Sequence, residues 1–411
     1  MTPISKHSRS RHLRAGLVAL AGLALLPTFA HGQARPAGQR PPVNSVEASI
    51  WDLSDKAEID ARRAGQLLSD PGLNSYVNGI RCKVAAEYCG DMRIYLMTRP
   101  AFNASMAPNG YMEMWSGLLL RADNEAQVAF VIAHETGHFQ ENHSIEAWRN
   151  MRSRSNWAMA LSIVAGAAGA PSYVGDLIYL GAIASVFGFS RENEVQADSI
   201  GFQRAIAAGY DPAQGSELWR LLIAEAAASQ FPDVRRREAR SGIFNTHPVS
   251  LARAATLDNM SRLAIEAQTA NAAATKPWIV GREAHRNAIR PFLGTWLRDE
   301  LRRRDYGQTL DLIKRLTGLG TDLGVLTFYE GELFRLRRGE GDLERALAAY
   351  QTASTFADAP ADTWRELGDA QSRAGKKTEA IAALQTYLTK FPNASDKDLV
   401  VARLDRMRAT N

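Results

Sequence analysis

The sequence predicts a mainly α protein, in which an α+β domain with a small sheet precedes an α-solenoid of helical repeats. Amphipathic helices are expected over residues 52–68 and 74–87. Residues 93–97 and 103–115 alternate as strands do, with Pro108-Asn109-Gly110 as a turn inside the second strand. The C-terminal part is expected to be helical, because its small and aromatic residues recur after 34 positions.

The second of these strands has two distinct faces. Tyr111, Glu113 and Trp115 are expected on one face, and Met112 and Met114 on the other. The plain interpretation is a structural hairpin. The alternative is an edge strand beside a functional site, to which an extended peptide adds itself.

Composition indicates a globular chain with no affinity for nucleic acid. The 411 residues are enough for two domains, and 45% are hydrophobic and 23% charged. The formal charge of +5 depends on residues 1–32, which hold four basic residues and no acidic ones. Without them, 45 Lys and Arg face 44 Asp and Glu, so the remainder is nearly neutral and a nucleic-acid partner is not expected.

Residues 1–32 have the pattern of a secretory signal peptide. A basic start is followed by an apolar core over residues 15–26, with cleavage expected after Ala30, Gly32 or Ala34. The apolar core is too short to span a bilayer comfortably, although an uncleaved N-terminal anchor remains an alternative. Export is therefore expected, and with it an oxidising environment.

The chain has two cysteines, Cys82 and Cys89. In an exported protein such a close pair favours a small disulfide-closed loop. Two free thiols are the alternative, because sequence does not determine the geometry of the pair.

The pattern H-E-x-x-H at residues 134–138 predicts a metal site on a helix. His134 and His138 lie four residues apart and therefore on one helix face, with Glu135 placed to accept a proton from water. Asp123 is expected to cap this helix. The alternative is a solvated helix face without a metal.

Sequence spacing also narrows the rest of the ligand set. The extended motif with a third histidine requires Gly at 141 and His at 144, but Glu141 and Ser144 stand there. His143 lies five residues beyond His138, off the ligand face, and is expected to form structural hydrogen bonds.

A third ligand is expected on a helix that opens at Ser190 and ends at Gly209. Glu194 and Asp198 are four residues apart and share a face of this helix. A catalytic zinc requires three protein ligands, so Glu194 is the candidate, and Asp198 would accept the ring N–H of a ligating histidine. The alternative is an ordinary acidic helix face.

Two further segments carry weaker signals. His247, fixed by the following Pro248, is a candidate to assist an oxyanion or to occupy the open metal position. Arg253, six residues further on, is expected to support the metal ligands without binding the metal itself. Residues 157–189 are strongly apolar but interrupted, which favours a buried helical hairpin over contact with a membrane surface.

The three motifs together, H-E-T-G-H, E-V-Q-A-D and T-H-P, resemble the zinc metallopeptidase family that includes the CAAX prenyl endopeptidases and their bacterial heat-shock relatives. This resemblance covers roughly residues 50–265. It implies a zincin-type (gluzincin) fold with one Zn²⁺ per chain. The implied ligands are His134, His138 and Glu194, with Glu135 as general base and His247 as the residue that assists the transition state or gates the metal.

The C-terminal residues fit the tetratricopeptide repeat over 361–394. Ala346, Tyr350 and Ala353 precede Ala380, Leu384 and Tyr387 by 34 residues each. Gly331 and Phe334 open the preceding repeat, and a degenerate repeat is expected around residues 296–316. A generic helical bundle is the alternative.

The expected organisation is thus a signal peptide (1–32), a flexible leader (33–50), a zinc metallopeptidase domain (51–265) and tetratricopeptide-like repeats (276–411). The resemblance implies an exported endopeptidase that hydrolyses misfolded or misassembled envelope proteins. In the periplasm its repeats would recruit clients or the outer-membrane assembly machinery, with peripheral membrane contact as an alternative. The alternative is a chaperone or assembly adaptor that acts through the repeats with little proteolysis.

Overall fold

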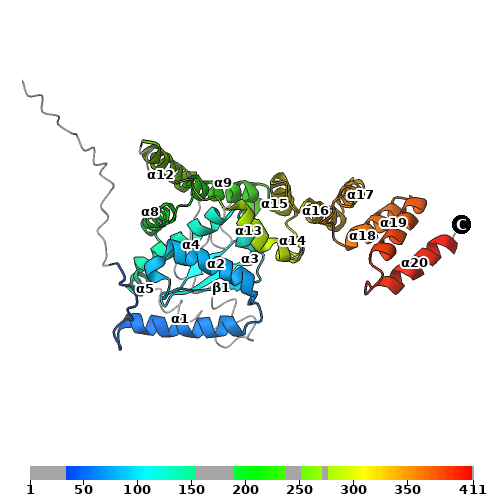
Figure 1. Ribbon diagram of the computed structural model, residues 1–411. Coiled ribbons are helices and arrows are strands. Elements are labelled where there is room, and N and C mark those ends of the chain that lie inside the picture. Colours follow the sequence, from blue (N-terminus) through cyan, green and yellow to red (C-terminus); the bar gives the residue numbers. More distant parts are fainter. Residues whose placement is uncertain (1–33, 154–188, 237–250, 271–275, 410–411) are drawn as a thin grey trace, which may run out of the picture. The chain divides into compact units, whose positions relative to one another are not determined.

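The computed structural model describes residues 34–153, 189–236, 251–270 and 276–409 (Figure 1). Residues 34–411 form one compact unit. The fold class is the expected one, mainly helical with one small sheet. Among the described residues, no helix is long and apolar enough to cross a membrane. The predicted apolar hairpin lies outside the described residues, except for Phe189.

The segment before the first helix, which belongs to the predicted flexible leader, makes specific contacts with the rest of the protein. The backbone N–H of Arg35 donates to Gln140 O at 2.8 Å, and the Tyr88 hydroxyl donates to Arg35 O at 2.6 Å. The Arg35 guanidinium is buried over the Phe139 ring. Helix α1 (Val46–Arg63) then begins six residues before the predicted start, because the Ser45 side chain caps it.

Helix α2 (Pro71–Val84) begins with Asp70 as its N-cap and Pro71 in its first turn. It therefore starts and ends about three residues before the predicted helix. Cys82 near its end is disulfide-bonded to Cys89, which confirms the predicted closed loop.

The sheet has three strands in the order β1-β3-β2. β1 (Arg93–Met97) pairs parallel with β3 (Tyr111–Trp115), and β2 (Ala104–Met106) pairs antiparallel with β3. The predicted strand over 103–115 is thus a hairpin, and its second half is central. β1 and β2 are the outer strands, and β2 packs against the helix that carries H-E-x-x-H.

The two faces of the sheet are covered by different helices. Met112 and Met114 of β3 face the main core, which also includes residues of α2. Tyr111 faces Ala57 and Ala61 of α1, together with the partly buried Trp115. The alternation of β3 is therefore as expected, and α1 lies along the lower side of the sheet in Figure 1.

The central helices follow the sheet. They are α3 (Ser116–Arg121), α4 (Glu125–Gln140), α5 (His143–Ser153), α8 (Arg191–Ala207), α9 (Ala213–Ala227), α10 (Pro232–Arg236) and α12 (Leu251–Ala270). The cap of α4 is Asn124, whose side chain accepts from Gln127 N, and not Asp123 as predicted. Asp123 is instead ion-paired with Arg315, a contact across 192 residues that local sequence does not reveal.

The C-terminal helices are α13 (Arg282–Ile289), α14 (Leu293–Arg302), α15 (Tyr306–Gly318), α16 (Leu323–Arg337), α17 (Asp342–Ala353), α18 (Asp362–Arg373), α19 (Lys377–Lys390) and α20 (Lys397–Ala409). α16 packs with α17, and α18 with α19. Each pair has a glycine at the contact: a Cβ on Gly331 would meet Tyr350, and one on Gly368 would meet Leu384. Tyr350 and Leu384 are predicted to occupy the same position of successive repeats. The two helices of each pair therefore approach closely at the same place in the repeat.

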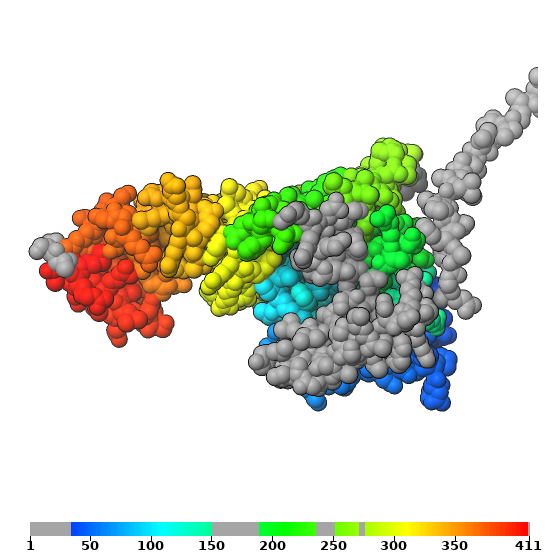
Figure 2. Space-filling model, turned by 180° about the vertical axis from the view of Figure 1, so that it is seen from behind, coloured from blue at the N-terminus to red at the C-terminus, as the bar shows by residue number. Residues whose placement is uncertain are grey.

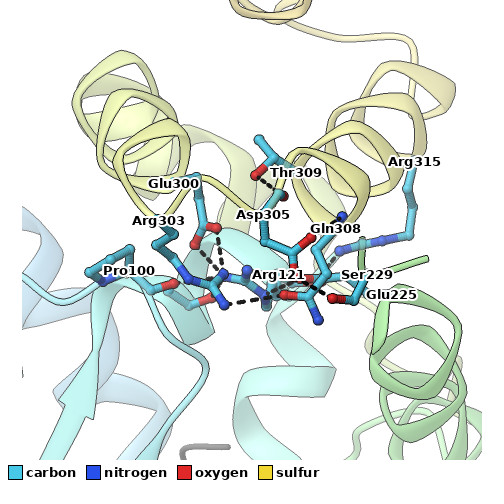
Figure 3. A network of polar contacts seen from close by, with 11 residues as sticks. Pro100, Arg121, Glu225, Ser229, Glu300, Arg303, Asp305, Gln308, Thr309 and Arg315 are labelled. Carbon is cyan, nitrogen blue, oxygen red and sulfur yellow. Dashed lines mark hydrogen bonds and ion pairs between the residues drawn. The ribbon is translucent and has the colours of Figure 1, made fainter. Parts of the chain in front are cut away.

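Buried charges join α14 to α3 and α9, which precede it in the chain (Figure 3). Arg121 of α3 donates to Glu300 of α14 at 2.7 Å and is ion-paired with Glu225 of α9 at 2.8 Å. Gly307 at the start of α15 lies so close to Ala228 that a Cβ would meet the carbonyl oxygen at 2.1 Å. In Figures 1 and 2, α15 accordingly lies beside α9.

Candidate metal centre

Helices α4 and α8 bring the two predicted metal motifs together because each contributes a glycine to their contact. A Cβ on Gly137 would lie 3.0 Å from Ala197 Cα, and a Cβ on Gly201 would lie 2.7 Å from His134 N. Any larger side chain at Gly201 would therefore separate the helices. α8 itself begins as predicted, with Ser190 and Asn193 forming a capping box.

His134, His138 and Glu194 converge on one point between these helices. The Nε2 atoms of the two histidines are 3.1 Å apart. Glu194 Oε2 lies 3.7 Å from His134 Nε2, and Glu194 Oε1 lies 3.5 Å from His138 Nε2. All three side chains are buried.

These three side chains fit a zinc ion. Two imidazoles and one carboxylate are a donor set that zinc accepts, and tetrahedral bonds of about 2.05 Å place neighbouring donor atoms about 3.4 Å apart. The two Nε2 atoms are 3.1 Å apart, and each has one of the two Glu194 oxygens within 3.7 Å, which is close to that value. Three protein donors also leave the fourth position of a tetrahedron for water or substrate.

Asp198 and Arg253 lie beside the candidate ligands. Asp198 Oδ1 is 2.9 Å from His134 Nδ1, so the carboxylate accepts that ring N–H and leaves Nε2 with a lone pair. Arg253 donates to both Asp198 oxygens at 2.7 Å and contacts Glu194 Oε2 at 2.7 Å. The guanidinium thus joins the candidate ligand to the candidate supporting carboxylate.

The buried charges of Asp198 and Arg253 stabilise each other. Burial alone would raise the pKa of Asp198, but the Arg253 charge and the hydrogen bond from His134 hold it well below its usual range. Burial would likewise lower the pKa of Arg253, yet the Asp198, Glu194 and Glu135 carboxylates raise it. Both groups therefore stay charged although they are buried.

The remaining predicted residues are Glu135 and His247. Glu135 lies between His134 and His138 in the sequence and is buried on α4. Its negative charge contributes to the raised pKa of Arg253. His247 lies outside the described residues, so its expected role stays a prediction.

The structure adds residues for which the sequence analysis had little signal. The Phe189 ring stacks on His138 with centroids 4.0 Å apart, and the Arg253 guanidinium lies over the Trp219 ring. Leu218 and Trp219 also line a small cavity of about 20 Å³ beside His134. The sequence analysis placed Phe189 only at the end of an apolar segment and gave no signal for Leu218 or Trp219, because their contacts join separate helices.

Comparison with known proteins agrees with this geometry. Residues 67–261 match the model of Peptidase family M48. The Beta-barrel assembly-enhancing protease of Escherichia coli (strain K12) is 25% identical over 269 residues, which are 61% of this chain and 53% of that protein. The Mitochondrial metalloendopeptidase OMA1 of Arabidopsis thaliana is 32% identical over 119 residues, 29% of this chain and 23% of the relative.

A second OMA1 metalloendopeptidase, from Schizosaccharomyces pombe, is 31% identical and covers 38% of this chain and 47% of that protein. The chain spans about half the length of the β-barrel assembly-enhancing proteases that it matches. The matched family segment contains both metal motifs and Arg253. Residues 67–261 are therefore similar to the metallopeptidases of Peptidase family M48, and the chain resembles the β-barrel assembly-enhancing proteases and the OMA1 metalloendopeptidases.

Proposed function

We propose that this protein is an exported, zinc-dependent endopeptidase whose substrates are misfolded or misassembled proteins of the cell envelope. The observation that carries the proposal is the convergence of two imidazoles and one carboxylate at separations suited to zinc. Similarity to proteases named for β-barrel assembly supports the choice of clients. The predicted signal peptide supports a periplasmic location.

In this proposal His134, His138 and Glu194 hold the metal. Zinc bound there would lower the pKa of water and polarise a peptide carbonyl. The Glu135 carboxylate would accept the proton of the attacking water and deliver it to the amide nitrogen as the C–N bond breaks. Asp198 and His134 would stay aligned through the Arg253 ion pairs.

The edge strand β2 is the proposed binding place for an extended substrate. In the antiparallel pair with β3, Ser105 is hydrogen-bonded to Glu113, because Asn103 and Ala107 bond to Trp115 and Tyr111. The backbone groups of Ala104 and Met106 therefore point away from β3, toward the outer edge of the sheet. Since β2 packs against α4, a peptide strand added there would run beside H-E-x-x-H.

The helices α14–α19 are proposed to act as tetratricopeptide-like repeats that recruit clients or the outer-membrane assembly machinery. The equivalent glycine contacts of α16–α17 and α18–α19 support this, because stacked equivalent helix pairs form a continuous binding surface.

The substitution Glu135→Gln tests the proposed catalytic base. It removes the proton acceptor and keeps the size of the side chain, so hydrolysis of a casein-type substrate is expected to fall by at least about 100-fold. Zinc content, measured by atomic absorption on the purified protein, should remain one ion per chain, because the three proposed ligands are untouched.

Two results would contradict the proposal. Unchanged casein hydrolysis by Glu135→Gln protein would show that Glu135 is not the base. A wild-type protein that binds no zinc and cleaves nothing, but still supports envelope assembly, would favour the adaptor alternative.

A further inference from the structure

A chain of hydrogen bonds connects His138 to the end of α4 through residues that have no role in the proposal above. His143 Nδ1 lies 2.9 Å from His138 Nδ1, and His143 Nε2 lies 3.1 Å from Gln196 Oε1. The Gln196 side-chain amide donates to Glu141 Oε2 at 2.8 Å. His143 opens α5, Gln196 lies in α8, and Glu141 follows α4, so three separate elements meet here.

The direction of this chain is determined from its Glu141 end. An ionised carboxylate only accepts hydrogen bonds, so the Gln196 NH₂ group must face Glu141 and its carbonyl must face His143. The carbonyl also only accepts, so His143 must carry its proton on Nε2. With its single proton on Nε2, the neutral His143 ring offers Nδ1 as an acceptor.

The consequence falls on His138. Since His143 Nδ1 accepts, the atom facing it, His138 Nδ1, must be the N–H donor. The proton of the neutral His138 ring is then on Nδ1, and Nε2 has a lone pair. Asp198 imposes the same arrangement on His134, so two lone pairs lie 3.1 Å apart next to a carboxylate. Such an arrangement is repulsive unless a cation lies between them.

We propose that His143 and Gln196 are positioning residues that, with Glu141, hold His138 in the tautomer and orientation needed to bind the metal. This inference rests on the proposed zinc site. The rings around His138 support this inference. The Phe189 ring stacks on the His138 ring, and the His143 ring meets the His138 ring edge-on with centroids 4.9 Å apart. The two histidine ligands are thus oriented differently, His134 by a charged carboxylate and His138 by a neutral relay.

Zinc affinity measured by competition with a chromophoric chelator tests this inference without an activity assay. His143→Phe keeps the ring and removes the acceptor, so the dissociation constant for Zn²⁺ is expected to rise about 10–100-fold. Gln196→Met removes the next acceptor and is expected to cause a smaller rise in the same direction. The visible absorption of bound Co²⁺ should change in His143→Phe, because it reports ligand geometry.

Two matched controls separate positioning from general loss of stability. His285→Phe removes another buried histidine with two hydrogen bonds, to Leu119 O and Tyr76, away from the candidate ligands. Val195→Met places the same side chain as Gln196→Met on the adjacent, exposed position of α8. Both controls should bind Zn²⁺ like the wild type.

The outcomes are distinct. If His143→Phe binds Zn²⁺ within about twofold of the wild type, the inference is wrong while the proposed peptidase can stand. If His143→Phe does not fold, equal affinities of Gln196→Met and Val195→Met overturn it instead. If the wild type binds no Zn²⁺, the proposed function and this inference both fail.

Discussion

At the scale of single residues, His285 links folding to pH. It is buried on α13, where its Nε2 donates to Leu119 O at 3.0 Å and its Nδ1 accepts from the Tyr76 hydroxyl at 3.1 Å. Burial lowers its pKa from 6.5 to about 4, although the nearby carbonyls of Leu119 and Ala122 oppose the shift. Between these two pH values His285 is therefore neutral in the folded protein and protonated in the unfolded chain.

The sign of the resulting pH dependence follows from proton counts. Between pH 6.5 and 4 the unfolded state binds more protons at this site, so the free energy of unfolding falls as pH falls through that window. The contribution of His285 to this loss is at most about 3–4 kcal/mol, because a tenfold difference in proton affinity between the two states corresponds to about 1.4 kcal/mol.

His285→Gln should reduce the loss of stability in acid, because glutamine does not titrate. The measurement is urea unfolding of both proteins, followed by tryptophan fluorescence, at pH 7 and pH 4. The contributions of the metal site and of the carboxylates are common to both proteins and cancel in the comparison. An equal drop in the free energy of unfolding for both proteins would refute this assignment.

Residue-level prediction from sequence succeeded where the partners lie within one helix turn or one motif. The i, i+4 spacings placed His134 with His138 and Glu194 with Asp198, and the structure brings all four together. Prediction failed at Asp123, because the contact with Arg315 depends on the long-range packing of α15. The orientation of His143 toward His138 was equally inaccessible, since it depends on where α5 begins.

At the scale of elements, the close contact of α4 and α8 controls the candidate metal centre. Sequence predicted both helices, but not that Gly201 lies against the His134 backbone. The order of the strands was likewise not predictable, because β1 reaches its central partner β3 by a parallel pairing that skips β2. Such pairings depend on packing across the sheet and have no local sequence pattern.

Gly201→Ala should weaken both folding and metal binding. The added methyl would lie 2.7 Å from His134 N, so α8 must shift and withdraw Glu194 and Asp198 from the imidazoles. Overpacking of this kind costs about 1–3 kcal/mol. The measurement is the melting temperature with saturating Zn²⁺ and with a chelator: the variant should melt lower in both, with a smaller stabilisation by Zn²⁺.

Gly79→Ala is the matched control, because Gly79 is also helical but has open space where the methyl would be. This substitution should be neutral or stabilise by up to about 1 kcal/mol and should leave the Zn²⁺ effect unchanged. If the two variants behaved alike, the close approach of α8 to α4 would not control the site.

At the scale of the whole molecule, the ion-pair group around Arg121 ties α14 to α3 and α9 (Figure 3). Burial and the Glu300 charge raise the pKa of Glu225 despite Arg121, whereas Arg121 and Arg303 lower the pKa of Glu300 against the effect of burial. Two buried carboxylates thus depend on one guanidinium, which is itself only 2% exposed. Removing that guanidinium leaves Arg303 as the remaining partner of Glu300 in this group.

Arg121→Met is therefore expected to lower the free energy of unfolding by about 3–5 kcal/mol, because it leaves buried charge without compensation. Arg262→Met breaks the exposed pair with Glu266 on α12 and should cost less than about 1 kcal/mol. Chemical unfolding of both variants measures the difference.

The triple variant Arg121→Met, Glu225→Leu, Glu300→Leu separates charge from packing. Apolar replacement of a complete buried ion group is often neutral or stabilising, so this protein should recover most of the stability that Arg121→Met loses.

Limited proteolysis shows which part of the chain is loosened. If α14 is held by this group, cleavage between residues 270 and 290 should become faster in Arg121→Met and return toward the wild-type rate in the triple variant. Equal cleavage rates in all three proteins would mean that the neighbouring contact of Gly307 with Ala228 holds the junction instead.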